Sequence, residues 1–140
     1  MMDGLFKVLD IAASGMTAER FRLNVISQNL ANSDTTRTEE GGPYRRKAIV
    51  FEEALNKTTK GREEFSGVKI FSIVDDPSPF RLVYDPNHPD ANEEGYVEYP
   101  NVNVLREMID MISAQRAYEM NAAVVNSAKS MYNSALGIGR

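Results

Sequence analysis

One stretch of the chain carries several side chains that could bind a metal ion. Residues 85–95 have the sequence Asp-Pro-Asn-His-Pro-Asp-Ala-Asn-Glu-Glu-Gly, and carboxylate and amide oxygens are the ligands that calcium prefers. An EF-hand loop starting at Asp85 needs an oxygen ligand at its fifth position and glycine at its sixth, where this chain has Pro89 and Asp90. We therefore expect a solvated acidic loop or a salt-bridging contact, with no metal site and no cofactor.

Catalytic chemistry has few side chains to draw on. His88 is the single histidine and cysteine is absent, so neither an ordinary zinc site nor a disulfide framework can be assembled. A Ser-His-Asp triad would have to use His88, and no nucleophile-elbow spacing accompanies it. Gly41-Gly42 lacks the rest of a phosphate-binding loop. The sequence predicts no catalytic residues, no small-molecule substrate and no enzyme.

A basic cluster, Arg45-Arg46-Lys47 beside Tyr44, is the other candidate for binding chemistry. Three basic residues in a chain of net charge −4 are weak support for nucleic-acid binding. Residues 63–100 hold nine acidic and two basic side chains, which makes them the better partner for the cluster. We expect the two to meet on the same or the next subunit, and we expect no nucleic-acid partner.

The elements that position these groups begin with a long helix over residues 5–32. Apolar residues recur there at alternating steps of four and three, as in a heptad pattern. The positions are Leu5, Leu9, Ala12, Met16, Leu23, Ile26 and Leu30, with Glu19 as the polar exception. Asp3 is expected to cap the start, and Asn32 to close the end in a left-handed conformation.

The last segment repeats this design over residues 104–136. Asn101 or Asn103 is expected to cap the helix, and Gly137 to end it. The predicted apolar positions are Val104, Met108, Met111, Tyr118, Ala122, Val125, Tyr132 and Leu136, with Gln115 and Lys129 in the polar gaps.

Strands are predicted between the two helices. Residues 44–51 indicate a strand that leads into a short helical piece at Glu52–Lys57, and residues 68–74, 80–84 and 96–99 indicate three further strands. The expected fold class is α+β. Long N- and C-terminal helices pack as an antiparallel, coiled-coil-like pair, with a small antiparallel β-rich domain between them.

The domain prediction follows from this order of elements. Residues 1–35 and 101–140 are expected to form a terminal helical assembly domain, and residues 36–100 a β-rich middle domain with its connecting loops. With 42% hydrophobic and 26% charged residues in 140, the chain is too apolar for global disorder.

The polar face of the first helix is unusual in composition. Residues 23–33 carry no charge but are rich in Asn, Gln and Ser. In a homopolymer every surface charge recurs in each copy, whereas amides both donate and accept hydrogen bonds. This face therefore predicts packing against other helices. A closed dimer of a coiled-coil adaptor or secretion chaperone is the alternative, although charged flanks would suit that better.

Three motifs, in order and at compatible spacing, resemble the bacterial flagellar rod and hook proteins in their proximal-rod form. They are SGMTAERFRLNVISQNLANSDTT (residues 14–36), the longer spacer RTEEGGPYRRKAIVFEEAL (residues 37–55), and residues 84–136 from YDPNHPDANEEGY to MYNSAL. The resemblance covers essentially the whole chain. It implies a structural subunit of the flagellar basal-body rod that polymerises helically through its terminal helices.

The resemblance also implies partners and a location. Expected partners are further copies, other flagellar rod proteins, the rod-base adaptor, the membrane-ring protein and the flagellar type III export machinery. The expected location is the periplasm-spanning rod of the basal body. Export without a cleaved signal peptide is expected, because Asp3 and Asp10 interrupt the place of a secretory apolar segment.

Subunit-interface residues are predicted on both terminal helices and on the basic cluster. On the first helix they are Leu5, Leu9, Met16, Leu23, Ile26, Asn29, Leu30 and Asn32. The basic segment contributes Tyr44, Arg45 and Arg46. The last helix contributes Met108, Ile112, Tyr118, Asn121, Val125 and Tyr132.

Overall fold

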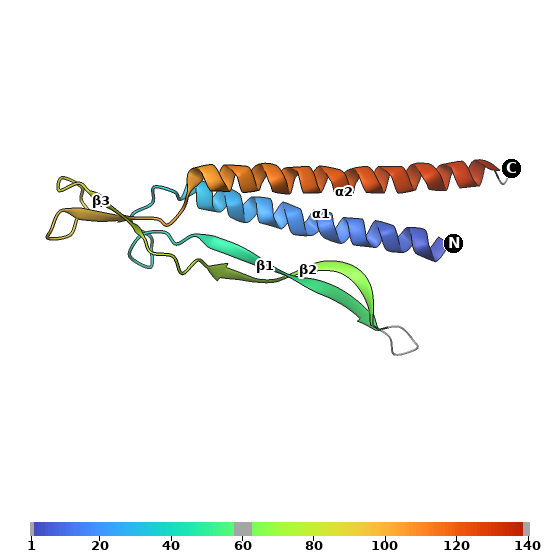
Figure 1. The fold of residues 1–140 in the computed structure, drawn as a ribbon, viewed down its shortest axis with the longest axis horizontal. Coiled ribbons are helices and arrows are strands. Elements are labelled where there is room, and N and C mark those ends of the chain that lie inside the picture. The colour runs from blue at the N-terminus through green and yellow to red at the C-terminus, as the bar shows by residue number, and fades with distance from the viewer. Residues whose placement is uncertain (1, 58–62, 139–140) are drawn as a thin grey trace. The chain divides into compact units, whose positions relative to one another are not determined.

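The computed structural model describes residues 2–57 and 63–138. Its elements are α1 (Met2–Ala31), β1 (Lys47–Lys57), β2 (Glu63–Asp75), β3 (Arg81–Tyr84), β4 (Tyr96–Tyr99) and α2 (Val104–Ile138). β1 pairs with β2, and β3 pairs with β4, in two separate two-stranded sheets. The predicted α+β class, with two long terminal helices flanking a small antiparallel β region, is confirmed (Figure 1).

The chain forms two compact units. The first consists of residues 1–23, 50–72 and 112–140, and the second of residues 24–49 and 73–111. Both helices and the strands β1 and β2 contribute residues to both units. The division at residues 35 and 101 that the sequence suggested remains a prediction.

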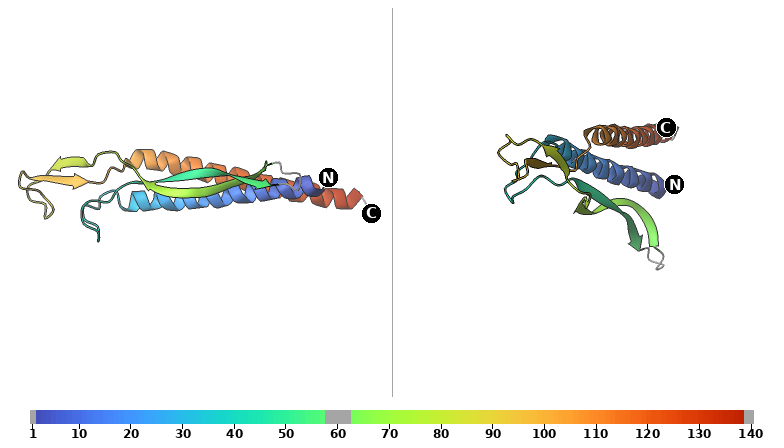
Figure 2. Two further views of the ribbon diagram at one scale, coloured as in Figure 1. Left: turned by 90° about the horizontal axis from the view of Figure 1, so that it is seen from below. Right: turned by 60° about the vertical axis from the view of Figure 1, so that its left-hand side comes forward.

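In the first unit, α1 lies between α2 and the β1–β2 hairpin (Figures 1 and 2). Two adjacent small residues of α1 make these contacts. Ser14 faces the hairpin, where its Oγ accepts a hydrogen bond from the backbone N–H of Val68 at 3.1 Å. A Cβ on Gly15 would lie 2.8 Å from the Nδ2 atom of Asn121 in α2. Small side chains at these positions let α1 approach both neighbours closely.

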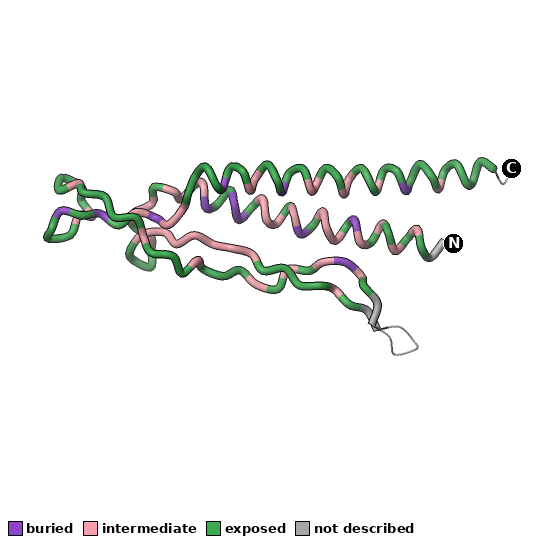
Figure 3. The backbone as a smooth tube through the Cα atoms, in the orientation of Figure 1, coloured by how far each residue is buried: buried purple, intermediate pink, exposed green. Residues whose placement is uncertain are grey.

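The inward side of α2 differs from the predicted one by one residue. Ala114 and Ala128 are buried, whereas Gln115 and Lys129, which the prediction placed inward, are exposed. Most of α2 is exposed in the single chain (Figure 3). The physical reason is close packing: alanine leaves the room that a near neighbour requires, and the long polar side chains stay in water. Of the other predicted positions, Met111, Tyr118, Ala122, Val125 and Tyr132 are half-buried, and Val104, Met108 and Leu136 are exposed.

Four local predictions need correction. Residues 52–57 are not helical but continue β1, because pairing with β2 outweighs the helix preference of Glu, Ala, Leu and Lys. No described non-glycine residue has a positive φ, so Asn32 is not left-handed. Instead its Nδ2 donates to the carbonyl of Gln28, in the last turn of α1, at 2.9 Å. Gly137 lies inside α2, and Asp3 lies inside α1 rather than before it.

Asn103, one of the two residues predicted to cap α2, caps the start of this helix. The Oδ1 atom of Asn103 accepts a hydrogen bond from the backbone N–H of Arg106 at 3.0 Å, which satisfies one of the unpaired donors of the first turn. Asn101, the other alternative, instead bonds to the backbone of Arg46 and of Asp76.

In the second unit, β3 and β4 form an antiparallel hairpin in which Val83 faces Val97 and Tyr84 faces Tyr96. Val97 is fully buried, and the rings of Tyr84 and Tyr96 meet edge to face at 5.2 Å between centroids. Both strands confirm the predictions at residues 80–84 and 96–99. The four residues of β3 are exposed, so this hairpin buries one side of one strand only.

Gly67 provides a test of how tightly the β1–β2 hairpin sits on α1. Its φ is +123°, and a Cβ there would collide with the Oγ of Ser14. Gly67→Ala is expected to lower the free energy of unfolding by about 3 kcal/mol, from backbone strain and the collision together. Gly41→Ala is the control, because Gly41 also has a positive φ but open space around it. Urea unfolding of both variants measures the difference, and equal losses would contradict close packing at Ser14.

Candidate functional site

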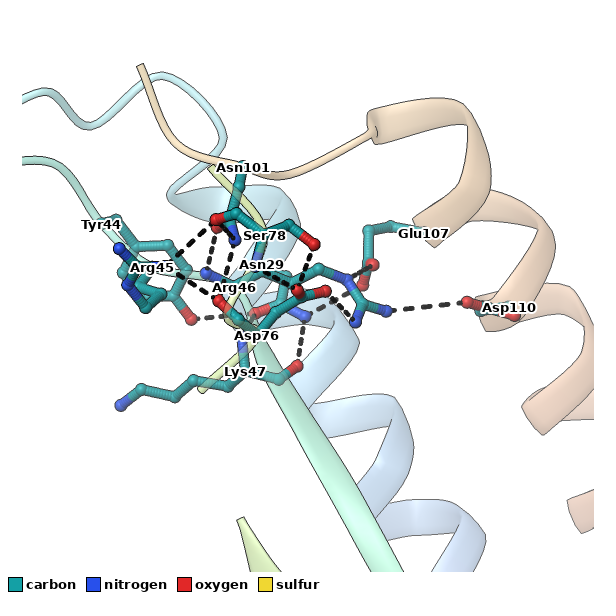
Figure 4. A network of polar contacts seen from close by, with 10 residues as sticks. All are labelled: Asn29, Tyr44, Arg45, Arg46, Lys47, Asp76, Ser78, Asn101, Glu107 and Asp110. Carbon is teal, nitrogen blue, oxygen red and sulfur yellow. Dashed lines mark hydrogen bonds and ion pairs between the residues drawn. The ribbon is translucent and has the colours of Figure 1, made fainter. Parts of the chain in front are cut away.

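A polar network joins the end of α1, the segment before β1 and the first turns of α2 (Figure 4). It consists of Asn29, Tyr44, Arg46, Lys47, Asp76, Asn101 and Glu107, and all of them belong to the second unit. Two of these polar side chains are almost completely buried, Asn29 at 1% exposure and Glu107 at 0%. Buried polar groups are costly unless each finds partners, so the network must be complete to be stable.

Asn29 uses its full hydrogen-bonding capacity. Its Nδ2 donates to the carbonyl of Lys47 at 2.9 Å and to the Oε2 of Glu107 at 3.0 Å. Its Oδ1 accepts from the Tyr44 hydroxyl and from the backbone N–H of Lys47, both at 2.9 Å. The amide therefore pairs with both backbone groups of Lys47, as a neighbouring strand would. This contact fixes the first residue of β1 against α1.

Glu107 connects the same point to α2. Its Oε1 accepts from the Nε of Arg46 at 2.6 Å, so with Asn29 on Oε2 both carboxylate oxygens are paired. Arg46 extends further, because Nη1 lies 3.3 Å from Asp76 Oδ2 and Nη2 lies 4.0 Å from Asp110 Oδ2. Three carboxylates around one guanidinium compensate the burial of its charge.

The pKa shifts within the network favour the charged forms of Arg46 and Asp76. Burial lowers the pKa of Arg46, but its hydrogen bond to Glu107 and the charges of Glu107 and Asp76 outweigh burial and raise the pKa overall. Hydrogen bonds from the hydroxyl and backbone of Ser78 lower the pKa of Asp76, and Arg46 adds to that effect. Tyr44 stays neutral, because burial raises its pKa, as do the charges of Asp75 and Glu107.

A second group of contacts closes the turn after β2. Asn101 accepts a hydrogen bond from the backbone N–H of Arg46 at 2.8 Å and donates to the carbonyls of Asp76 and Ser78, both at 3.1 Å. The Nη1 of Arg45 donates to the same two carbonyls, at 2.9 and 3.1 Å. The Arg45 guanidinium also lies 4.2 Å from the centroid of the Phe80 ring. The chain is thus tied together before β1, after β2 and before α2.

The expected meeting of basic and acidic segments is confirmed within the chain. Arg46 pairs with Asp76, which lies in the acidic stretch of residues 63–100. Arg45 differs, since it binds backbone carbonyls and an aromatic ring. Whether the same segments also meet between subunits remains a prediction.

The acidic loop at residues 85–95 is held by hydrogen bonds of its own. The Oδ1 of Asn92 accepts from the backbone N–H groups of Glu94 and Tyr96 at 3.0 and 2.8 Å. The Nδ1 of His88 accepts from the backbone N–H of Asp90 at 3.1 Å, and the carboxylate of Asp90 accepts from the Thr36 hydroxyl at 2.8 Å. Within residues 2–57 and 63–138, no group of three or more His, Cys, Asp or Glu side chains is arranged to hold a metal ion.

Neither of the two described helices is both long enough and apolar enough to cross a membrane.

The predicted interface residues fall into three groups within the chain. Ile26 and Asn29 are buried, and Met108 and Ile112 are exposed. The remaining residues are half-buried: Leu5, Leu9, Met16, Leu23, Leu30, Asn32, Tyr44, Arg45, Arg46, Tyr118, Asn121, Val125 and Tyr132. The network brings Asn29, Tyr44 and Arg46 together inside one chain, so their polar groups are already paired there. Contact of the whole set with other subunits remains a prediction.

Sequence reasoning missed Glu107, Asp76 and Asn101. The missing indication was the pair of alanines Ala114 and Ala128, two heptads apart, which mark the inward side of α2; Glu107 lies seven residues before Ala114. Giving small residues the same weight as large apolar ones would have placed Glu107 inward. A buried glutamate then requires a cation, and Arg45 and Arg46 were the candidates.

Comparison with known proteins shows full-length similarity to one group. Residues 9–37 match the family described as Flagella basal body rod protein, and residues 93–138 match Flagellar basal body rod FlgEFG protein C-terminal. The flagellar basal-body rod protein FlgC of Borreliella burgdorferi is 49% identical, over 96% of this chain and 97% of the relative. The FlgC proteins of Bacillus subtilis and Yersinia enterocolitica are 46% and 42% identical, over 96% and 97% of this chain and 98% of each relative.

The first prediction from the network concerns Asn29. Asn29→Ala removes four hydrogen bonds and leaves buried groups of Lys47 and Glu107 unpaired, so we expect a loss of about 3 kcal/mol in the free energy of unfolding. Asn24→Ala is the matched control, because Asn24 is an exposed amide on the same helix, and a change within about 0.5 kcal/mol is expected. Denaturant unfolding measures the free energy of unfolding of both variants. Similar losses for the two variants would mean that the network adds little to stability.

The second prediction concerns pH. Because the folded-state pKa of Asp76 is lowered, its contribution to stability is complete above the unfolded pKa and disappears as pH falls through the folded pKa. Ser78→Ala removes the hydrogen bond from the Ser78 hydroxyl, which is the largest cause of the lowered pKa of Asp76, and keeps the one from the backbone N–H. The stability difference between wild type and Ser78→Ala should therefore be constant above about pH 5 and shrink below pH 4. Ser113→Ala, at an exposed position of α2, should show a difference that does not vary with pH. A constant difference for Ser78→Ala would contradict the assignment.

Proposed function

Because the chain belongs to the FlgC family of flagellar basal-body rod proteins and is a structural subunit of that rod, we propose that it polymerises helically through its terminal helices. The observation that carries this proposal is the exposed apolar surface of α2. The exposed large side chains are Val104, Leu105, Met108, Ile109, Ile112, Met120, Val124, Met131, Leu136 and Ile138. So many exposed large apolar side chains on one helix are typical of a surface that binds other protein.

The uncharged part of α1 supports the same proposal. Asn24, Ser27 and Gln28 are exposed in the single chain. Uncharged amides and hydroxyls can both donate and accept hydrogen bonds, so they suit a contact between identical copies, where charges would repel. The predicted interface residues belong to this proposal, with Met108 and Ile112 as the positions most open to contact. Asn29 and Arg46 take part indirectly, by holding the start of α2 in place.

Partners and location follow from family membership. We infer assembly with further copies, with other rod proteins, and with the rod-base adaptor and membrane-ring protein, in the rod that spans the periplasm. Delivery through the flagellar type III export machinery, without a cleaved signal peptide, belongs to the same inference. The function is structural and not enzymatic, with no nucleic-acid or small-molecule substrate.

The test changes an exposed residue, so that assembly is affected and folding is not. Ile112→Asp is expected to leave the free energy of unfolding within about 0.5 kcal/mol of wild type and to abolish swimming when it replaces the native chain. A buried carboxylate without a partner is the physical reason for the loss of assembly. Swimming in soft agar and recovery of the variant with purified basal bodies are the measurements.

Leu82→Asp is the matched control, because Leu82 is an equally exposed aliphatic residue in β3, outside the terminal helices. Cells with this variant should swim. Normal swimming by the Ile112→Asp strain would show that the exposed side of α2 is not needed for assembly.

A further inference from the structure

We infer that the first turns of α2 in one copy of this chain bind the outward face of the β1–β2 hairpin in a second copy. The inference rests on the proposed function, which supplies the polymer, and it specifies which two surfaces make one contact within it.

The first surface, called the α2 patch, consists of Val104, Leu105, Met108 and Ile109. All four are exposed, Leu105 at 70% and Ile109 at 60%. Their spacing of one and four residues places them along two turns of one side of the helix. Glu107 turns the other way and is buried in the polar network. Because the network fixes the rotation of α2 at this point, the α2 patch is held facing outward.

The second surface, called the hairpin patch, is centred on Phe71, which is 68% exposed. Side chains of a strand alternate between its two faces, and in β2 Lys69 and Phe71 are exposed while Val68 and Ile70 are half-buried. The Nζ of Lys69 lies 3.6 Å from the Oε2 of Glu52, which places Glu52 of β1 on the same outward face.

Val50 completes the hairpin patch. It lies two residues before Glu52 in β1 and therefore shares its face, and it is 40% exposed. The patch is thus an aromatic ring and a valine beside a cross-strand ion pair. An exposed aromatic residue with a polar border is the usual composition of the centre of a protein interface.

The charges of the two units indicate what binds the α2 patch: the first unit of a second copy. The second unit, which carries the α2 patch, has twelve acidic and six basic side chains, and the first unit, which carries the hairpin patch, has eight acidic and ten basic. Pairing two second units would bring two strongly negative surfaces together. Pairing a second unit with a first unit is attractive, and charge complementarity of this kind selects partners.

The contact is of the head-to-tail type, because the two patches are different surfaces of the same chain. Both are exposed in the single chain, so each copy presents one patch of each kind. A contact of this type that does not close into a ring repeats without limit. A pairing of identical patches would instead stop at a dimer.

The chain lacks cysteine, so engineered disulfides report the contact directly. A disulfide requires the two Cα atoms to lie within about 7 Å. The full-length double variant Phe71→Cys, Ile109→Cys replaces the native chain in swimming cells, which are then treated with a mild thiol oxidant. We expect a ladder of cross-linked multimers of this chain, lost on reduction. The variant Tyr84→Cys, Ile109→Cys is the control, because Tyr84 is exposed to a similar degree in β3, and it should give no ladder.

Co-expression of the two single variants sharpens the test. One chain carries Phe71→Cys and the other Ile109→Cys, with different tags. A head-to-tail contact allows one disulfide per pair, so mixed dimers and nothing larger are expected. Disulfides between two Phe71→Cys chains or two Ile109→Cys chains would overturn the inference, as would cross-linking of either position to a different protein in place of this chain.

Failure of the inference and failure of the proposed function are distinguishable. If the double variant swims and is recovered in basal bodies but gives no ladder, the rod function stands and this contact is wrong. If the wild-type chain is absent from basal bodies, the proposed function itself fails.

Discussion

The second unit depends on the compensation of one buried charge. Glu107 has no exposure to water, and an ionised carboxylate in that position is stable only with a cation and hydrogen-bond donors at hand. Arg46 and Asn29 supply them at 2.6 and 3.0 Å. These residues come from α2, from the segment before β1 and from α1, so the charge is compensated only when all three segments are in place.

This constraint has a consequence for the surface of α2. Glu107, Ala114 and Ala128 are buried on one side of α2, with Met111, Tyr118, Val125 and Tyr132 half-buried. The other large apolar residues of the helix point away from that side. They face solvent in the single chain, where they would favour aggregation in a protein that worked alone. In the assembly that we propose, neighbouring subunits cover these residues. The fully buried positions of α2 are thus occupied by small and polar residues, and its exposed large apolar residues are the ones that we propose for assembly.

The sequence predicted the elements better than their faces. Heptad spacing located both helices, and β-branched and aromatic runs located β3 and β4, because these are local properties. The local composition of residues 52–57 favours a helix, whereas their β structure arises from pairing with β2, which begins at residue 63. The side of α2 was chosen by apolarity, which favoured Met108 over Glu107, and a buried ion pair between residues 46 and 107 leaves no local trace. Asn29 was expected to face other subunits, but its four hydrogen bonds, to Lys47, Glu107 and Tyr44, are made within its own chain.

The most direct test of this account is amide hydrogen exchange at Lys47 in the free wild-type chain. Its N–H has the Oδ1 of a buried asparagine side chain as acceptor, so protection there reports the network itself. We predict exchange as slow as in the middle of α1, at neutral pH and low denaturant. Exchange at the rate of an unstructured peptide would show that the network is not formed in the free chain, and that Glu107 does not join the helices and β1.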